Sequence, residues 1–274
     1  MKVGITGAGG YVGSHLVASI AQRGHEVVPL SRDRGFRLGE PPSAELLAGL
    51  DAVIHTAYDF SARGWTEIER VNVGGSLALL DAATASGVSR FVFVSSLAAY
   101  EGCRSLYGRG KVKVEAEVLR RGGSVVRPGT IFGGKGGGLF QSVSNLVAKV
   151  PLIPLPDRGD QTLYLIHIDD LCEILEMMIR LPLPDGQRLV TAACPEGMKF
   201  HEILRQLARR QGSRRLFFPV PSALMLLPLQ AAEAVVGPRL PVRGDSLVSL
   251  LNPNPLPNFN LPGPLSGMRF RAFE

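Results

Sequence analysis

The sequence begins with Val3-Gly-Ile-Thr6 after two residues, runs directly into Gly7-Ala-Gly-Gly10-Tyr-Val-Gly13, and continues through an amphipathic segment to about residue 23. The apolar residues before the glycines predict a buried strand, and the period of the later segment predicts a helix. Glycines at such a turn allow the backbone to approach a pyrophosphate, which then lies on the helix N-terminus. An ordinary strand-turn-helix corner is the alternative, but the position and flanks of the motif favour dinucleotide binding.

The same alternation of apolar runs and helix-length segments continues through the first half of the chain. Strand-like runs occupy residues 26–30, 52–56, 90–95 and 124–127, and helix-like segments occupy residues 44–50, 68–86 and 107–121. This rhythm is typical of βαβ units, so we predict an α/β fold with a Rossmann-like, doubly wound parallel sheet. Sheets of this kind bind ligands at the carboxyl ends of their strands.

The pattern becomes less regular after Gly133. Helices are expected near residues 139–149, 171–180 and 200–211, and five prolines beyond Leu251 predict an irregular surface tail. We therefore expect residues 1–150 to form a dinucleotide-binding domain. Residues 151–274 would add the last sheet elements and a small C-terminal substrate-binding subdomain.

Composition narrows the class of protein. The chain has 274 residues, 45% hydrophobic and 20% charged, so it can bury a large core and is not globally disordered. A net charge of +6 suits phosphate-bearing ligands without specifying one. Three cysteines without CxxC spacing argue against a disulfide framework or a zinc site, and no metal is expected. The absence of a signal-peptide pattern in the first residues predicts a cytoplasmic protein.

The end of the run at 26–30 bears on the choice of cofactor, because Ser31 and Arg32 follow it. An acidic residue there would hold the ribose hydroxyls of NAD, whereas arginine and serine suit the additional phosphate of NADP. Asp33 is close to this position, and a solvated loop charge is the alternative interpretation of Arg32. We expect NADP(H) to be preferred, with NAD(H) possible.

A second group of residues suggests acid/base chemistry. Ser96 follows the strand-like run 90–95, and Tyr107-Gly-Arg-Gly-Lys111 opens a helix on which Tyr107 and Lys111 share one face. A phenol is a poor base at neutral pH, but a neighbouring ammonium favours its ionised form. The pair could then act on a hydroxyl or carbonyl, with Ser96 donating a hydrogen bond to the same oxygen. Tyr-x3-Lys alone is common on helix surfaces.

Taken together and in this order, the motifs resemble the short-chain dehydrogenase/reductase superfamily. The branch is the extended or atypical one, the NAD(P)-dependent epimerase/dehydratase family. The resemblance covers roughly residues 1–180 and rests on Thr6–Gly13, Asp51–Ala57, Asn72, Ser96, Tyr107, Lys111, Arg127–Gly133 and His167–Asp170.

The resemblance implies a role for each matching position. The pyrophosphate turn would comprise Gly7, Gly10, Tyr11, Val12 and Gly13. The cofactor would also be lined by Ser31, Arg32, Glu40, Thr56, Ala57, Tyr58 and Pro128. Tyr107 would be the acid/base, Lys111 would bind the nicotinamide ribose, Ser96 would polarise the substrate carbonyl, and Asn72 would anchor a bend or a water relay. His55 and His167 lie in recurrent family motifs and are expected to be structural.

Two departures from the family pattern bear on the substrate. Only 11 positions separate Ser96 from Tyr107, which predicts a shortened roof over the site. Residues 159–165 lack the arginine that family members acting on nucleotide sugars often carry before the final Asp-Asp motif. The missing arginine, together with a short C-terminal half, weakens the expectation of a nucleotide-sugar substrate.

Two further features have simple explanations. The cluster Arg209, Arg210, Arg214 and Arg215 could contact nucleic acid or anionic lipid, but a solvated helix end is favoured and no nucleic-acid partner is expected. The apolar stretch 216–236 is interrupted by prolines and polar residues, so we predict core packing and no stable membrane span. Docking at a membrane interface is the weaker alternative.

The leading prediction is an NAD(P)-dependent oxidoreductase or epimerase/dehydratase that exchanges hydride with a small-molecule substrate bearing a hydroxyl or ketone. One alternative is a nucleotide-sugar epimerase or dehydratase with tightly held NAD(P). Another is a non-catalytic NADP(H)-binding sensor or scaffold. A homodimer is possible by analogy with the family.

Overall fold

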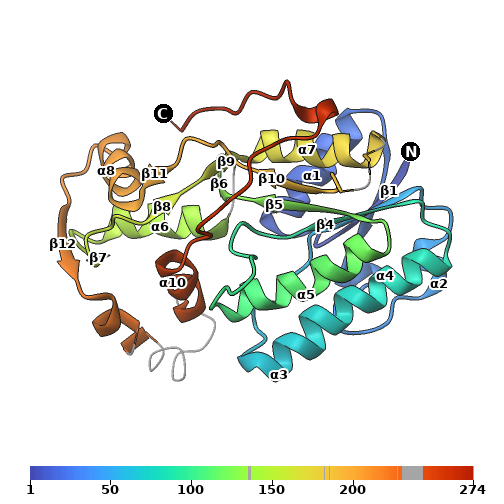
Figure 1. Cartoon of the computed structure of the whole chain (residues 1–274), viewed down its shortest axis with the longest axis horizontal. Coiled ribbons are helices and arrows are strands. Elements are labelled where there is room, and N and C mark those ends of the chain that lie inside the picture. Colours follow the sequence, from blue (N-terminus) through green and yellow to red (C-terminus); the bar gives the residue numbers. More distant parts are fainter. Residues whose placement is uncertain (135–136, 182, 185, 227, 230–242, 274) are drawn as a thin grey trace.

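A computed structural model describes the chain except for residues 135–136, 182, 185, 227, 230–242 and 274. Its centre is a six-stranded parallel sheet in the order β10-β5-β4-β3-β1-β2 (Figure 1). The strands are β1 (Lys2–Thr6), β2 (Glu26–Leu30), β3 (Ala52–His55), β4 (Arg90–Val94), β5 (Ser124–Pro128) and β10 (Leu189–Ala192). The predicted doubly wound parallel sheet is confirmed.

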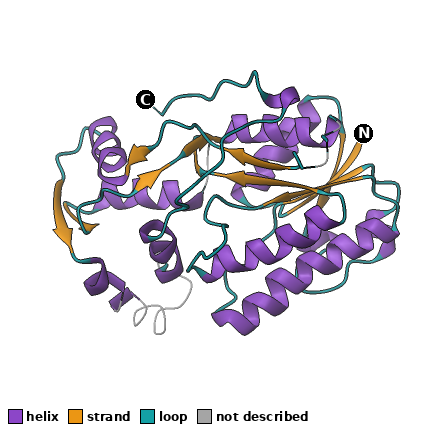
Figure 2. Cartoon of the chain, in the orientation of Figure 1, coloured by secondary structure: helices purple, strands orange, loops and turns teal. Residues whose placement is uncertain are grey.

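Helices cover both faces of the sheet (Figure 2). On one face α1 (Tyr11–Gln22) packs against α7 (Ile168–Arg180), and their apolar side chains share a core with β1, β3 and β4. The other face carries α2 (Ala44–Leu47), α4 (Gly75–Ala85) and α5 (Leu106–Arg120), which share a second core with the same sheet. Strands buried on both faces explain why the runs in the sequence are continuously apolar.

The helix expected over residues 68–86 is interrupted. It consists of α3 (Gly64–Ile68), a π-helical segment η2 (Glu69–Gly74) and α4. Asn72 lies in the π-helical segment, and such bulges are frequent at functional sites. The interruption therefore places Asn72 where its side chain can serve the loop after β3.

The second half of the chain builds a smaller group of elements at the left end of Figure 1. It contains three two-stranded sheets, and α6 (Gly138–Lys149) packs there against α8 (Phe200–Arg210). The strand pairs are β6 (Thr130–Phe132) with β9 (Leu165–His167), β7 (Leu152–Pro156) with β12 (Leu216–Val220), and β8 (Thr162–Leu163) with β11 (Met198–Lys199). Because β10 also comes from this half, it contributes the last strand of the main sheet. The domain boundary at residue 150 stays a prediction.

The C-terminal segment crosses the molecule after α10 (Gly244–Leu251). It is irregular, as predicted, apart from the short 3-10 turn η4 (Gly263–Leu265). The prediction of a surface tail needs correction, because Leu265 is buried in the core formed by α1 and α7. Arg271 also pairs with the buried carboxylate of Asp170. These contacts fasten the segment to the fold.

The apolar stretch from residue 216 also departs from expectation. Leu216 is 72% exposed, Phe218 37% and Leu224 64%, so the prediction of core packing is wrong for these side chains. Residues 230–236 of the stretch lie outside the described part of the chain. Among the described residues, no helix combines the length and apolar character needed to cross a membrane.

Candidate active site

The glycine turn after β1 has room for backbone only. Gly7 adopts a φ of +65°, and its carbonyl accepts a 2.8 Å hydrogen bond from the amide of Gly10. A Cβ on Gly13 would lie 2.0 Å from that same carbonyl oxygen, so a side chain there would collapse the turn. No side chain caps the N-terminus of α1 at Gly10. The compact turn and uncapped amides fit a pyrophosphate group.

The loop after β3 is tied to the same turn. The Thr56 hydroxyl donates to the carbonyl of Thr6 at 2.6 Å, and the amides of Thr56 and Ala57 donate to the Thr6 hydroxyl at 3.1 Å. A Cβ on Gly7 would lie 2.8 Å from Thr56 Oγ1. The order of the sheet reverses between β1 and β3, where doubly wound sheets bind their ligands. Gly7, Thr56 and Ala57 therefore lie together at the carboxyl ends of β1 and β3, where a dinucleotide is expected to bind.

His55 is fully buried and hydrogen-bonded at both ring nitrogens. Nδ1 lies 2.7 Å from the Thr6 hydroxyl, and Nε2 lies 2.8 Å from the hydroxyl of Ser76. Burial, with a smaller contribution from the charge of Lys111, lowers the pKa of His55 to about 3. A neutral ring that joins β1, β3 and α4 agrees with the structural role expected for it. His167 similarly caps α7 by accepting from the amide of Asp169.

Asn72 holds the backbone of the loop after β3. Its Oδ1 accepts from the amide of Asp59 at 2.7 Å, and its Nδ2 donates to the Asp59 carbonyl at 3.0 Å. Only 3% of Asn72 is exposed. Both ends of the amide are therefore committed to the chain segment that carries Tyr58 and Phe60.

Ser96, Tyr107 and Lys111 come together at the carboxyl end of β4. Burial raises the pKa of Tyr107 to about 12 and outweighs the influence of the Ser96 side chain, which lowers it. The charges of Asp245 and Glu115 raise it further. Burial and the two nearby carboxylates thus favour the neutral phenol in this structure.

Lys111 is buried, and its burial lowers the pKa of its amino group. Its side chain is 4% exposed, and Nζ donates to the carbonyl of Val94 at 2.8 Å. Nζ also lies 4.5 Å from the ring centroid of Phe93 and 5.7 Å from that of Tyr107. Burial lowers the pKa of Lys111 to about 7, against the opposing influence of Glu115. The ammonium is thus only partly populated at neutral pH.

Aromatic side chains surround the phenol. The rings of Tyr58 and Tyr107 meet edge to face at 4.8 Å, and the ring of Phe60 stacks on Tyr107 at 6.0 Å. Phe60 is 57% exposed, so this apolar ring is available to a ligand beside the Tyr107 hydroxyl. The prediction of Tyr58 as a cofactor contact did not include this contact with Tyr107.

Asp245 is a functional candidate that sequence reasoning missed. Its two carboxylate oxygens accept from the amides of Leu106 and Tyr107 at 2.8 and 2.9 Å, at the N-terminus of α5. Asp245 lies on α10, 138 positions along the chain from Tyr107. No spacing or local motif could have linked the two. The carboxylate holds the backbone at Tyr107, and its charge adds to the larger effect of burial in raising the pKa of the phenol.

The remaining predicted cofactor residues lie around the same edge of the sheet. Arg32 is exposed after β2, and its charge contributes to lowering the pKa of Asp59. The Ser31 hydroxyl bonds Asp33 and lowers the pKa of that carboxyl. Glu40 is exposed and pairs with Arg37 at 3.4 Å.

Three other predicted residues make contacts within the protein. The Tyr11 hydroxyl donates to the carbonyl of Gly133 at 2.6 Å, and Val12 packs on the core. Pro128 is the buried last residue of β5 and pairs with Ala192 of β10. The side chains of Tyr11 and Val12 are thus turned toward protein, which leaves their backbone for the pyrophosphate turn.

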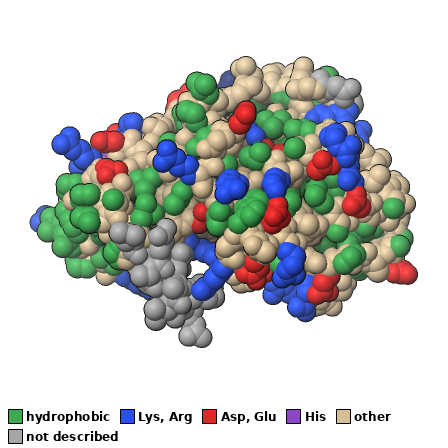
Figure 3. Space-filling model, turned by 60° about the horizontal axis from the view of Figure 1, so that its bottom comes forward, with side chains coloured by type: hydrophobic (Ala, Val, Ile, Leu, Met, Phe, Trp, Pro, Cys, Tyr) green, Lys and Arg blue, Asp and Glu red, His purple; other side chains and the backbone are tan. Residues whose placement is uncertain are grey.

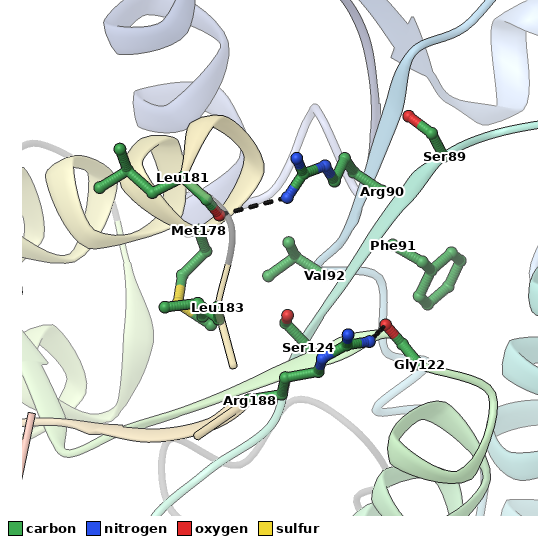
Figure 4. A pocket seen from close by; sticks show the side chains of 10 residues that line it. All are labelled: Ser89, Arg90, Phe91, Val92, Gly122, Ser124, Met178, Leu181, Leu183 and Arg188. Atoms are coloured by element: carbon green, nitrogen blue, oxygen red, sulfur yellow. Dashed lines mark hydrogen bonds between the residues drawn. The ribbon is translucent and has the colours of Figure 1, made fainter. Parts of the chain in front are cut away.

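A cavity of about 280 Å³ lies at the opposite end of the strands (Figure 4). Ser89 and Ser124, at the starts of β4 and β5, line it together with Arg90 and Arg188. Arg90 donates to the carbonyl of Leu181, and Arg188 donates to that of Gly122. This cavity is separate from the site formed around Tyr107.

Comparison with known proteins identifies the family. Residues 3–190 match the NAD dependent epimerase/dehydratase family. The chain is also 33% identical over 239 residues to the ceramide reductase of Caulobacter vibrioides, which covers 80% of this chain and 73% of that protein. The chain belongs to the NAD-dependent epimerase/dehydratase family. The predicted enzyme type, an NAD(P)-dependent oxidoreductase or epimerase/dehydratase, is confirmed at this level, as is a nicotinamide dinucleotide cofactor.

Two other known proteins are similar to this chain in sequence or in fold. It is 27% identical over 229 residues to a 3 beta-hydroxysteroid dehydrogenase/Delta 5-->4-isomerase of Mycobacterium tuberculosis, covering 68% of this chain and 62% of that protein. Its fold matches the UDP-glucose 4-epimerase of Thermus thermophilus, solved in complex with NAD, with a TM-score of 0.67 at 22% identity. That match covers 91% of this chain and 98% of the other. The two chains therefore share one fold over most of their length.

Proposed function

We propose that the protein is an NADP(H)-preferring reductase that converts a ketone on an apolar substrate to a hydroxyl. The observation that carries this proposal is the buried Tyr107 phenol, whose pKa is influenced by the Ser96 side chain and whose ring stacks against the exposed ring of Phe60. A neutral phenol can give a proton to a carbonyl oxygen, and an exposed aromatic ring favours an apolar group beside it.

The roles of the chain's residues follow from their contacts. NADPH, held at the glycine turn, would supply the hydride to the ketone carbon, and Tyr107 would give its proton to the ketone oxygen. Ser96 donates a hydrogen bond to the same oxygen and stabilises the negative charge that develops there. Lys111, held by Val94, lies beneath the aromatic rings and carries the predicted contact with the nicotinamide ribose. Asn72 and Asp245 position the two segments that carry these groups.

The preference for NADP(H) is supported by the residues after β2. Neither of the two residues that follow β2, Ser31 and Arg32, is acidic. Arg32 is exposed where an additional phosphate on the adenine ribose would approach. Asp33 already engages the Ser31 hydroxyl, so Arg32 is the main candidate for that phosphate.

The substrate class is supported by the relatives. A ceramide reductase and a 3 beta-hydroxysteroid dehydrogenase are named for substrates with large apolar bodies, which suits the exposed ring of Phe60. A nucleotide-sugar epimerase is the second candidate, favoured by 35% identity over 119 residues to the UDP-glucose 4-epimerase of Streptomyces lividans. An epimerase recycles its cofactor in place, whereas a reductase consumes NADPH. A cytoplasmic location and a homodimer remain predictions from the sequence.

Consumption of NADPH by the purified chain tests the proposal. The substrates to compare are a long-chain acyl ketone, a steroid ketone and UDP-glucose, each with NADPH and with NADH. We expect net oxidation of NADPH with one of the apolar ketones and none with UDP-glucose. Interconversion of UDP-glucose and UDP-galactose without net NADPH oxidation would overturn the proposal in favour of the epimerase.

A further inference from the structure

The outer face of the small sheet formed by β7 and β12 is apolar and open to solvent. Leu152 of β7 pairs in register with Leu216 of β12, and these side chains are 51% and 72% exposed. Pro154 pairs likewise with Phe218, which is 37% exposed. Figure 3 shows hydrophobic side chains gathered at this end of the molecule, on the left. Exposed apolar clusters of this kind commonly mark interaction sites.

The inner face of the same small sheet is fully used by the fold. Ile153 and Leu155 alternate with Leu152 along β7 and are 1% and 5% exposed. Both belong to a core that also includes residues of α6 and α8, and Phe217 packs against it. The outer residues are therefore held on a supported sheet, so changing them does not remove core contacts.

The segments at one end of this outer face carry basic residues, whereas Asp157 follows β7 at the other end and accepts from the amide of Ser222 at 3.0 Å. Residues 145–156 contain Lys149 as their one charged residue, and residues 203–222 contain five arginines. Two of the arginines have structural partners. Arg215 donates to the carbonyls of Val147 and Ala148, and the guanidinium of Arg210 lies 4.4 Å from the ring centroid of Phe273.

Lys149, Arg209 and Arg214 are exposed, and no carboxylate pairs with them within the part of the chain that the structure describes. Lys149 and Arg214 lie at one end of the apolar face, and Arg209 is in the last turn of α8, which packs against α6. Lys149 ends α6 just before β7, and Arg214 is two residues before Leu216. The amide of Leu216 bonds the carbonyl of Pro151, which keeps the two segments adjacent.

We propose that this face docks on an anionic lipid bilayer. Leu152, Leu216 and Phe218 enter the interface between headgroups and acyl chains, and Lys149, Arg209 and Arg214 contact the lipid phosphates. Apolar residues combined with flanking cations are how proteins bind the membrane surface without spanning it. The docking does not depend on the proposed reaction, since it uses none of the residues around Tyr107.

Two other occupants fit less well. In a symmetric dimer the same patch would cover its own copy, which hides the apolar side chains but brings no phosphate to the cations beside them. Nucleic acid is held by phosphate contacts spread along a basic groove and by stacked bases. Here the centre of the face is largely aliphatic, and the cations lie to one side. An anionic membrane offers an apolar interior to the exposed leucines and phenylalanine, and phosphates to the cations.

Sedimentation of the full chain with vesicles tests the proposal. One vesicle preparation contains equal parts phosphatidylcholine and phosphatidylglycerol, and the other contains phosphatidylcholine alone. We expect strong binding to the anionic vesicles at low salt, weaker binding at physiological salt because of screening, and little binding to phosphatidylcholine. Failure to sediment with the anionic vesicles at low salt would overturn the proposal.

Two paired variants separate the components of the surface. Arg209→Gln with Arg214→Gln should weaken binding by about 30-fold, since each cation near an anionic membrane contributes about 1 kcal/mol. Leu152→Gln with Leu216→Gln should weaken it by about 10-fold through loss of apolar insertion. Unchanged stability against urea verifies folding, as expected for exposed side chains.

Matched controls remove the same groups elsewhere. The pair Arg70→Gln with Arg269→Gln changes the net charge equally, and Leu256→Gln removes a leucine that is 87% exposed. Both should bind like the natural sequence. Equal weakening in the charge control would overturn the proposal in favour of a net-charge effect. Light scattering that shows a dimer abolished by Leu152→Gln with Leu216→Gln, or displacement from vesicles by duplex DNA at low concentration, would also overturn it.

Discussion

Replacing Lys111 by methionine should change how the stability of the folded chain depends on pH. Burial lowers the pKa of Lys111 from 10.5 to about 7 in the folded chain. The unfolded chain holds this proton throughout the range from about pH 7 to pH 9, whereas the folded chain gives it up. Because the unfolded state then binds more protons, the free energy of unfolding of the natural protein rises with pH in this window.

The magnitude follows from the same pKa. At about pH 7 the depressed pKa destabilises the fold by about 4 kcal/mol, and at about pH 9 by about 2 kcal/mol. The natural protein should therefore gain about 2 kcal/mol over this range relative to Lys111→Met. The variant also leaves the Val94 carbonyl without the Lys111 donor. That loss of about 1 kcal/mol does not depend on pH, so it cancels from the comparison.

Urea unfolding of both proteins without added nucleotide, at several pH values across the window, provides the measurement. Lys113→Met is the matched control on the same helix, because Lys113 is 52% exposed and pairs with Glu69 at the surface. The control should follow the pH dependence of the natural protein. A constant difference between the natural protein and Lys111→Met would refute the reasoning that Lys111 is desolvated in the folded state.

Three further predictions concern the site. Tyr107→Phe should reduce turnover by about 100-fold to 10,000-fold while NADPH still raises the melting temperature, and unchanged turnover would remove Tyr107 as the proton donor. Asp245→Ala should lower the free energy of unfolding by about 1 to 2 kcal/mol, because two amides at the start of α5 lose their acceptor, and Asp245→Asn should recover part of it. The Asn variant should also move the fall of the ketone reduction rate at alkaline pH to lower pH, because a charge that raises the pKa of Tyr107 is gone. NADP should raise the melting temperature more than NAD at equal concentration, and Arg32→Ser should narrow that difference; equal shifts in the natural protein would contradict the assignment of Arg32.

Residues close together in the sequence made much of the site predictable. The glycine turn is a local motif, since Gly7, Gly10 and Gly13 are required by one tight turn. Tyr107 and Lys111 share a helix face because of the helical period alone. Their meeting with Ser96 followed from the order of motifs along the chain and from the rule that parallel strands end at one edge of the sheet.

The protonation state of Tyr107 could not be predicted in the same way. The phenol and ammonium were expected to favour ionisation, and the sequence does not report how deeply either group is buried. In the folded chain Tyr58 and Phe60 stack around the phenol, and burial dominates its pKa. Desolvation depends on all the neighbours of a group, most of which are distant in sequence.

Period, composition and local motifs in the sequence determined the parallel sheet, the glycine turn and the pairing of Tyr107 with Lys111, because neighbouring residues alone set these features. Only the tertiary structure decided which distant groups meet. It brought Asp245 to the first turn of α5 and left Leu216 exposed beside Leu152. The sequence alone does not show whether an apolar side chain is buried by the rest of the chain or left exposed. Burial and long-range contacts belong to the folded chain as a whole, and they set both the proton on Tyr107 and the surface proposed for the membrane.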